Sequence, residues 1–521
     1  MPLRFRMGSL AVLFAAFASP GWAQAPQTDL AKRGEYLATA GDCMGCHTTK
    51  GGEPFAGAKV ETPFGIIYSP NITPDDETGI GKYTDDDFYK VMHQGLDHDG
   101  SYLYPAMPFD SYTKVTREDV TAIRAYLRNV KPVHQETPKN QLPFPYSVRA
   151  SLAVWRAVNF HEGEFKPDPQ RSDKVNRGAY LVEGLGHCGA CHTPRNLLQG
   201  SKQSQALGGA EITGQGWFAP NISSDVRQGI GGWSEQELVD YLKTGVASGK
   251  AIVAGPMAEV VHGSLSRLTD DDVHAMAAYL KSVPAQSLFK NEQSDGSAAY
   301  KATGAVAYLN NCGYCHQENG SGIEGAIPNL AGNAVVRAGG ADGVIRTILN
   351  GMEANGPYAP MPALGRAIAP GDIADIANYV RTAWGNAAPA NATPGQVSEL
   401  AKTTDTMLSG MSKCSPTPET ITAALNRVGG DAMLQATNDG NALETLNALV
   451  PKLKQAEPSI SQADLINGVT AAYCPIVMKD SAQPDDARLQ QLQRFSMLAF
   501  TAIAQRKLPA RGDKPVKTGQ N

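Results

Sequence analysis

Cys43-Met44-Gly45-Cys46-His47 is the stretch that decides the fold: two cysteines stand three positions apart and a histidine follows at once. The arrangement returns as Cys188-Gly189-Ala190-Cys191-His192 and as Cys312-Gly313-Tyr314-Cys315-His316. These three copies account for all but two of the 8 cysteines in a chain of 521 residues. The motif therefore belongs to an internal repeat, which is a stronger signal than any single copy.

Each copy lies in the same order of landmarks. A Tyr-Leu pair precedes the motif and a Pro-Asn-Ile or Pro-Asn-Leu triplet follows it. Then come a methionine that stands one or two positions after a proline, and a closing helix. Apolar stripes at helical spacing predict the closing helices near 117–130, 270–283 and 372–384. Thr116 and Thr269 are N-cap candidates for the first two. Shorter helices, each ended by a glycine, are predicted at 85–93, 235–244 and 343–349.

The motif has a definite chemical meaning. Two thiols three positions apart on one helical turn can bond to the two vinyl groups of a haem, and the next histidine then lies under the iron as an axial ligand. A structural zinc site needs four ligands, and each segment offers three. A redox-active cysteine pair would not need the fixed histidine. We therefore expect three covalently bound haem c groups, attached at Cys43, Cys46, Cys188, Cys191, Cys312 and Cys315, with axial ligands His47, His192 and His316.

Each iron needs a second axial ligand, and the methionine thioether is the soft donor expected beside histidine in an electron-transfer haem. The repeat predicts Met107, Met257 and Met361; a proline precedes Met257 and Met361 directly and Met107 by two positions, and it restricts the loop backbone. The alternative is that one of these fills a gap in the core while Met92, Met276 or Met352 binds the iron. With six positions filled, an iron exchanges electrons and binds no substrate, whereas a haem enzyme needs an open sixth position.

Other polar residues recur around the motif with two interpretations each. Asn71, Asn221 and Asn329 follow the prolines of the triplets and could hydrogen-bond a haem propionate or fix a turn. Arg195, three residues after His192, is a candidate partner for a propionate or a solvated surface residue.

The N-terminus predicts export. Arg4 and Arg6 precede an apolar stretch, and Ala23-Gln24-Ala25 has the form of a secretory cleavage site, so residues 1–25 are predicted as a signal peptide, with cleavage after Ala23 as a rival. No later stretch approaches about 18 uninterrupted apolar residues, so any membrane association is expected to be peripheral. The net charge of -5 and the lack of a dense basic run argue against nucleic acid as a partner.

Residues beyond the third repeat lack the motif. The low-complexity segment 387–394 is predicted as a hinge, and helical periodicity follows in 421–428, 442–453, 462–472 and 487–503. The last of these places Leu489, Leu492, Phe495, Phe500 and Ile503 on one apolar surface, for core packing or for docking to a partner or membrane. Cys414 and Cys474 are expected to pair as a disulfide in an oxidising compartment.

Several stretches carry a family resemblance beyond the motif itself. They include Thr62-Pro63-Phe64-Gly65, Tyr104-Pro105-Ala106-Met107-Pro108 and the run 178–195 around the second motif. Together with the first motif they closely resemble the triple-haem cytochrome c subunits of bacterial membrane-bound dehydrogenases, which serve alcohol, aldehyde, gluconate, sorbitol and fructose dehydrogenases. The resemblance covers about residues 30 to 385, and the C-terminal extension departs from it.

The resemblance implies that electrons pass from a separate catalytic subunit, a quinoprotein, flavoprotein or molybdoprotein, through three haems to ubiquinone at the periplasmic face of the cytoplasmic membrane. The alternatives are a free-standing multihaem electron carrier and a haem enzyme of the peroxidase type. The expected fold is mainly α, with three tandem class I cytochrome c domains at 26–135, 170–285 and 298–386 and a small helical domain at 395–521, the first two separated by a linker at 132–169.

Overall fold

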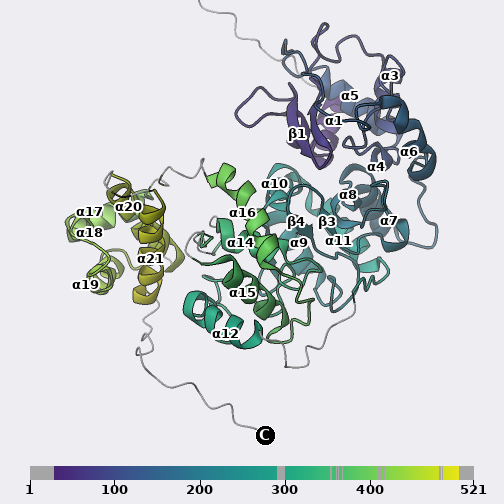
Figure 1. Cartoon of the computed structure of the whole chain (residues 1–521). Helices are drawn as coiled ribbons and strands as arrows, with labels where there is room; N and C mark the ends of the chain where they lie inside the picture. Colours follow the sequence, from purple (N-terminus) through teal and green to yellow (C-terminus); the bar gives the residue numbers. More distant parts are fainter. Residues whose placement is uncertain are drawn as a thin grey trace, which may run out of the picture.

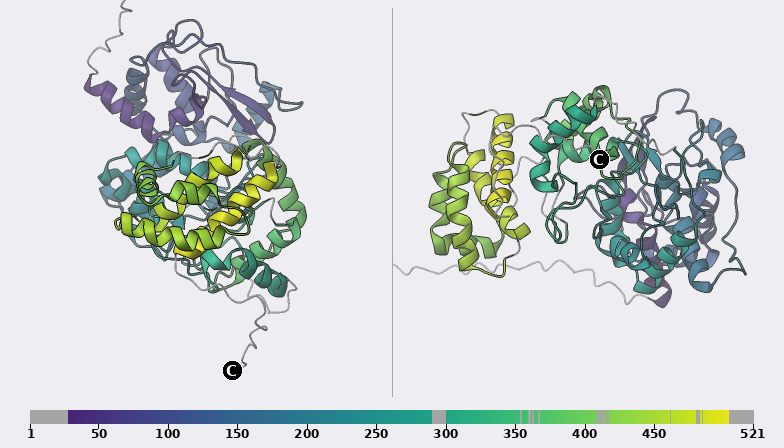
Figure 2. Two further views of the ribbon diagram at one scale, coloured as in Figure 1. Left: turned by 90° about the vertical axis from the view of Figure 1, so that its left-hand side faces the viewer. Right: turned by 90° about the horizontal axis from the view of Figure 1, so that it is seen from below.

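The computed structural model describes residues 28–289, 300–352, 355–358, 361, 363–365, 368–408, 414, 417–460, 462–479, 483 and 485–503. The expected signal peptide, residues 1–25, lies outside this part of the chain. Three helical domains follow one another from the upper right to the centre of Figure 1, and a bundle of helices stands at the opposite end from the first domain, as Figure 2 also shows.

The first domain and the segment 132–169 that follows it, here called its extension, contain seven helices and one hairpin among the described residues. Their bounds are α1 (Asp29–Ala40), α2 (Cys43–His47), β1 (Ala58–Thr62), β2 (Gly65–Ser69), α3 (Asp85–Gln94), α4 (Phe109–Tyr112), α5 (Arg117–Leu127), η1 (Arg149–Ser151) and α6 (Leu152–Asn159). Strands β1 and β2 pair antiparallel, with Ala58 opposite Ser69. The residue pattern predicts no strand here, and η1 and α6 fall in the stretch 132–169 that is predicted as a linker.

The second and third domains repeat this order with local changes. The second comprises α7 (Asp173–Tyr180), η2 (Leu181–Leu185), α8 (Gly189–His192), η3 (Gln203–Gln205), β3 (Ala210–Ile212), β4 (Trp217–Ala219), α9 (Glu235–Thr244), β5 (Val246–Ala247), β6 (Ala251–Ile252), α10 (Pro256–Gly263), η4 (Leu265–Arg267) and α11 (Asp270–Ser282). The third comprises α12 (Tyr300–Asn311), α13 (Gly313–His316), α14 (Asp342–Asn350), α15 (Pro370–Thr382) and α16 (Pro394–Leu408). Two further antiparallel hairpins, β3–β4 and β5–β6, lie in the second domain.

The predicted helix signals act where expected. The side chains of Thr116 and Thr269 accept hydrogen bonds from the backbone N–H of the third residue of α5 and α11, as N-caps do. The glycines predicted to end the shorter helices follow α3, α9 and α14 directly. All three closing helices, α5, α11 and α15, bury their apolar stripes, and Met276 is 1% exposed.

Each domain depends on a glycine where its first and closing helices cross. A Cβ on Gly34 would overlap the carbonyl oxygen of Ala122, and one on Gly178 would overlap that of Ala275. Gly304 of α12 meets α15 in the same way. The absence of a side chain lets the two helix backbones touch, so this crossing positions the motif that follows the first helix.

The first two domains share one hydrophobic core, which includes Leu37, Val120, Leu181 and Val273. Reciprocal polar contacts join them. In each domain, a tyrosine hydroxyl of the first helix donates to a buried aspartate on the closing helix of the other domain. An arginine from the same domain as the aspartate binds the same carboxylate. The pairs are Tyr36–Asp272 at 2.6 Å, Tyr180–Asp119 at 2.6 Å, Arg33–Asp119 at 2.9 Å and Arg177–Asp272 at 2.7 Å.

The predicted hinge at 387–394 and the domain boundary at 395 are wrong. Asn378 of α15 exchanges two hydrogen bonds of 2.9 Å with the backbone of Ala392, and Ala388 is 1% exposed. The next helix, α16, buries Val397 and Leu400 in the core of the third domain. The small residues of this segment, whose composition suggested flexibility, are the ones that can pack closely against α15.

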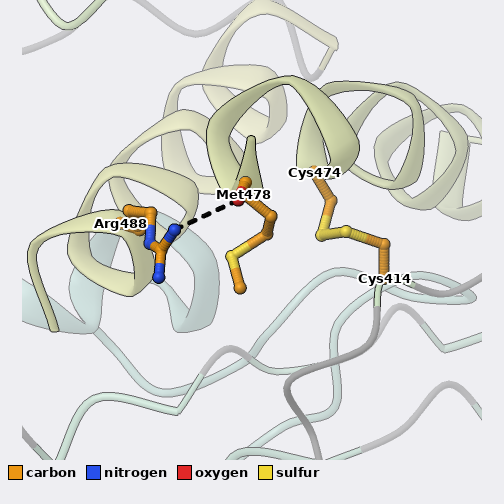
Figure 3. Close-up of a disulfide and its surroundings, with 4 residues drawn as sticks. All are labelled: Cys414, Cys474, Met478 and Arg488. Atoms are coloured by element: carbon orange, nitrogen blue, oxygen red, sulfur yellow. Dashed lines mark hydrogen bonds between the residues drawn. A yellow bond between two sulfur atoms is a disulfide. The ribbon is translucent and has the colours of Figure 1, made fainter. Parts of the chain in front are cut away.

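The bundle consists of α17 (Glu419–Val428), α18 (Gly430–Gln435), α19 (Ala442–Ala456), α20 (Gln462–Met478) and α21 (Asp485–Ile503). Cys414 is bonded to Cys474 of α20, with the Sγ atoms 2.08 Å apart, beside the hydrogen bond from Arg488 to the carbonyl of Met478 (Figure 3). Phe495 and Ile503 of α21 are each 1% exposed, so they belong to the core of the bundle. The side chains of Leu489 and Phe500 lie outside the described residues.

Candidate haem-attachment sites

The three motif histidines share one geometry. Each ends a short helix, and its Nδ1 atom lies at hydrogen-bond distance from the carbonyl oxygen of the proline that opens the Pro-Asn triplet. The pairs are His47–Pro70 at 2.8 Å, His192–Pro220 at 2.7 Å and His316–Pro328 at 3.0 Å. A carbonyl can only accept, so Nδ1 carries the proton and Nε2 keeps the lone pair that a metal ligand needs. Burial lowers the pKa of all three imidazoles, which favours this neutral form.

The six motif cysteines are thiols rather than redox partners. None of them forms a disulfide. Burial, together with the nearby carboxylate of Asp42, raises the pKa of Cys43 to about 12 and that of Cys46 to about 11. A redox-active cysteine pair works through a lowered thiol pKa, so this environment argues against that alternative. It suits thiols that serve as attachment points.

The asparagines of the first two triplets fix turns, whereas the side-chain amide of Asn329 donates to the carbonyls of Gly249 and Ala331. The Oδ1 atom of Asn71 accepts from the backbone N–H of Thr73 at 2.9 Å, and its Nδ2 donates to the carbonyl of Val133 at 2.7 Å. Asn221 repeats both contacts in the second domain. Their amides are fully engaged, which favours the turn interpretation over a propionate contact. The turn also presents the preceding proline carbonyl to the histidine.

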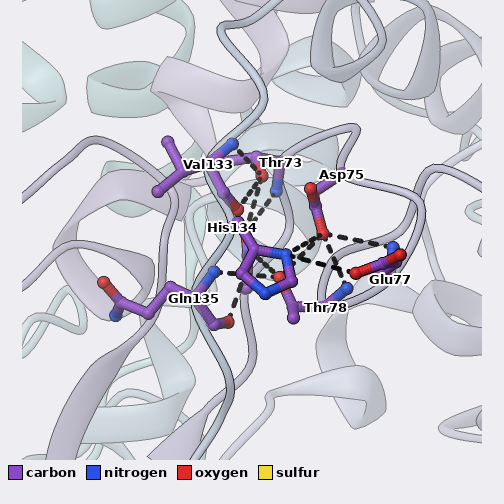
Figure 4. Close-up of polar contacts among 8 residues, drawn as sticks. Thr73, Asp75, Glu77, Thr78, Val133, His134 and Gln135 are labelled. Carbon is purple, nitrogen blue, oxygen red and sulfur yellow. Dashed lines mark hydrogen bonds and ion pairs between the residues drawn. The ribbon is translucent and has the colours of Figure 1, made fainter.

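The loop after Asn71 is tied to the start of the extension. Thr73 accepts from the backbone N–H of Val133 at 3.1 Å, and Thr78 accepts from that of Gln135 at 2.9 Å (Figure 4). His134 reaches toward Asp75 from the same segment, at 3.6 Å. The start of the extension therefore fixes the loop that directly follows Pro70 and Asn71, and the carbonyl of Pro70 orients His47.

In each domain a cationic side chain of the closing helix, which was not predicted from the sequence, donates to backbone carbonyls in the loop that follows the Pro-Asn triplet. Arg124 donates to the carbonyls of Ile80 and Tyr83 at 2.8 and 3.0 Å. Lys281 donates to those of Gly231 and Trp233, and Arg381 to that of Gly340. The signal is weak in the sequence because Arg124 lies one helical turn earlier in its helix than Lys281 does. Arg195, by contrast, donates to its own loop, to Ala190 and Ser201.

The predicted methionine ligands lie half-buried at the edges of the domain cores. Met107 occupies a bend just before α4, as a loop ligand should. Met257 differs from the expectation, because it stands in the first turn of α10 rather than in an extended loop; Pro256 is suited to start that helix. Met361 pairs with Met352 through two backbone hydrogen bonds of 2.9 Å, so both remain candidates in the third domain. Met92 and Met276 are core residues.

The first attachment segment packs against the second domain. Helix α10, which carries Met257, packs on α2, which carries the first motif. Asp42, directly before that motif, lies near Glu259 of α10, and burial together with this neighbour raises its pKa to about 6. Around the same boundary the ring of Tyr112 lies edge-on to His187. The shared core thus holds two of the three segments in a fixed relation.

The third segment is covered by the bundle. The bundle core includes Ala326 and Ile327 of the third domain, and Cys315 and Ile323 pack against it. Helix α13, which carries the third motif, contacts α21. The C-terminal extension therefore packs directly on the segment that would attach the third haem.

Comparison with known proteins agrees with this geometry. The cytochrome c family model matches residues 31–131, 175–284 and 301–384. The chain is 42% identical over 400 residues to the gluconate 2-dehydrogenase cytochrome c subunit of Pantoea cypripedii, covering 72% of this chain and 90% of that protein. It is 37% identical over 425 residues to the cytochrome c subunit of the quinone alcohol dehydrogenase of Komagataeibacter europaeus, covering 77% and 90%. It is 42% identical over 388 residues to the fructose dehydrogenase cytochrome subunit of Gluconobacter japonicus, covering 68% and 79%.

Proposed function

The chain belongs to the cytochrome c family, and on that premise we propose that it is the electron-transfer subunit of a dehydrogenase complex. It would receive electrons from a separate catalytic subunit and pass them to ubiquinone at the periplasmic face of the cytoplasmic membrane. The names of the similar proteins support the catalytic partner, since each is a cytochrome subunit of a gluconate, alcohol or fructose dehydrogenase.

The observation that carries the proposal is the threefold histidine–proline contact. Three imidazoles with Nδ1 protonated and Nε2 available follow three pairs of thiols, and this donor set fits three covalently attached haems. Bound haem supplies an iron that gains and loses one electron. The chain would hold His47, His192 and His316 neutral and oriented as iron ligands, and Met107, Met257 and Met361 would supply the second ligands, with Met352 as the alternative in the third domain.

The arrangement of the domains supports transfer rather than substrate chemistry. The reciprocal Tyr–Asp contacts and the common core keep the first two attachment segments at a constant separation, which suits passage of electrons between them. The bundle packed over the third motif shields that segment from water on one side. We therefore expect exchange with the partners to occur around the first two domains.

The location follows from the expected signal peptide at residues 1–25 and from the membrane dehydrogenases that the chain resembles. Among the described residues, no helix is long and apolar enough to cross a bilayer. We propose a peripheral association with the membrane.

The test is to purify the mature protein after gentle detergent extraction. We expect a haem-to-protein ratio of three, low-spin spectra, and a co-purifying quinoprotein, flavoprotein or molybdoprotein whose substrate reduces the cytochrome. A lower haem count would refute the site assignment. A cytochrome that always purifies alone would favour a free-standing carrier, and a high-spin haem that binds carbon monoxide rapidly would favour a peroxidase-type enzyme.

A further inference from the structure

Large apolar side chains stand exposed where the first domain's extension meets the second domain. Val154 and Val158 lie one turn apart on α6 and are 66% and 55% exposed. Leu197 and Leu198, in the loop after the second motif, are 101% and 50% exposed. We call Val154, Val158, Leu197 and Leu198 the apolar strip, and a soluble surface seldom gathers such side chains without a partner.

The two halves of the strip are fastened together. The indole N–H of Trp155 donates to the carbonyl of Leu198 at 2.8 Å, and Asn196 donates to Asn159 at 2.7 Å. These bonds join α6 to the loop although the two are about forty residues apart in sequence. The strip is therefore one surface shared by both domains.

The underside of α6 is anchored. The guanidinium of Arg156 lies 4.7 Å from the ring centre of Phe160 and 5.0 Å from that of Tyr102, and it donates to the carbonyl of Gln94. Leu152 is buried beneath the helix. Because these contacts orient α6, the outward direction of Val154 and Val158 is a property of the fold.

The charge around the strip differs from that of the whole chain. The sequence carries 51 acidic residues, yet none occurs from 137 to 161 or from 184 to 210. Exposed Arg149 lies in η1, directly before α6, and exposed Lys202 closes the loop that carries Leu197; within the described residues neither makes an ion pair. Arg149 instead donates to Ser101 and Tyr102, near acidic Asp99 at the margin.

We propose that the apolar strip docks on a bilayer surface that carries anionic headgroups. Apolar tips beside unpaired cations are the pattern of an interfacial membrane contact. The tips protrude, and Leu197 is fully exposed, so they fit a deformable lipid surface better than a rigid protein, which would need a matching hollow. The inference rests on the peripheral association in the proposed function, and it would bring the first two attachment segments close to the membrane.

The test uses the mature holoprotein in flotation assays with phosphatidylcholine vesicles with or without phosphatidylglycerol. We expect binding to the anionic vesicles that weakens at high salt. The double variant Val154→Ser/Leu197→Ser should bind about tenfold more weakly. Arg149→Gln and Lys202→Gln should each cost about fivefold.

Matched controls are Val306→Ser, which removes a side chain that is 60% exposed on α12, and Lys452→Gln, which removes an exposed cation of the bundle. Both should bind like the wild type. Equal binding by the strip variants, or no preference for anionic vesicles, would overturn the inference. So would strip variants that float normally but lose the catalytic subunit, because a protein would then cover the strip.

Failure of this inference can be told from failure of the proposed function. Haem content and reduction by the catalytic subunit in detergent solution need no vesicles. A chain that keeps both but ignores vesicles would retain its electron-transfer role and refute the docking surface alone.

Discussion

The reciprocal tyrosine contacts between the first two domains allow a quantitative test. The hydroxyl of Tyr36 lies 2.6 Å from the carboxylate of Asp272, and the hydroxyl of Tyr180 lies 2.6 Å from that of Asp119. Both aspartates are buried, at 8% and 2% exposure. A hydrogen bond to a charged group contributes about 1.5–3 kcal/mol. Each tyrosine-to-phenylalanine change leaves the carboxylate bound to its arginine, so the lower end, about 1.5 kcal/mol, applies to each.

Arg177, which binds Asp272, also lies over the ring of Tyr180, but phenylalanine keeps that ring. The two lost hydrogen bonds should therefore add to about 3 kcal/mol in Tyr36→Phe/Tyr180→Phe. For a unit of some 250 residues that loss corresponds to a fall in melting temperature of roughly 6–12 °C. The assay is thermal unfolding of the holoprotein, followed by circular dichroism and by the haem absorption bands. Tyr126→Phe is the matched control, because within the described residues its hydroxyl makes no hydrogen bond.

A double variant that melts at the wild-type temperature, or a Tyr126→Phe control whose melting temperature falls as far, would refute the reasoning.

The pH dependence of stability provides a second test of the same contacts. Burial alone would raise the pKa of Asp272, but hydrogen bonds from Arg177 and Tyr36 hold it below its ordinary value. This stabilisation is present above the unfolded pKa of about 4 and is lost as pH falls through the folded pKa. Tyr36→Phe should therefore shrink the acid-dependent part of stability.

Three further changes should have distinct effects. Met107→Ala should leave its haem attached while lowering its potential and opening the sixth position; an unchanged redox titration would contradict the ligand assignment. Gly178→Ala should cost about 1–3 kcal/mol because the new methyl group overlaps a backbone carbonyl, whereas Gly371→Ala, with open space around it, should melt like the wild type. Burial and Glu259 raise the pKa of Asp42 in the folded protein to about 6. The free energy of unfolding should therefore fall by on the order of 2 kcal/mol as pH rises from about 4 to about 6. Asp42→Asn should remove this pH dependence in denaturant titrations at several pH values.

Local patterns along the chain predict the repeated units and most of their helices. The spacing of Cys43, Cys46 and His47 is a covalent property of the chain, and the caps at Thr116 and Thr269 act within one turn of the helices they start. Such features depend on neighbours in sequence, so a pattern can reveal them. The same holds for the proline-asparagine triplets, although their role in orienting the histidines became visible once the carbonyl contacts were known.

Tertiary structure decided which segments pack together. Residues 387–394 have the composition of a hinge, yet Asn378 pins them to the third domain, and α16 joins that core instead of the bundle. The pairing of Tyr36 with Asp272 spans more than two hundred residues, and the covering of the third motif by the bundle joins distant parts of the chain. The free energy of such contacts depends on shape and burial between remote surfaces, which no local pattern of residues specifies.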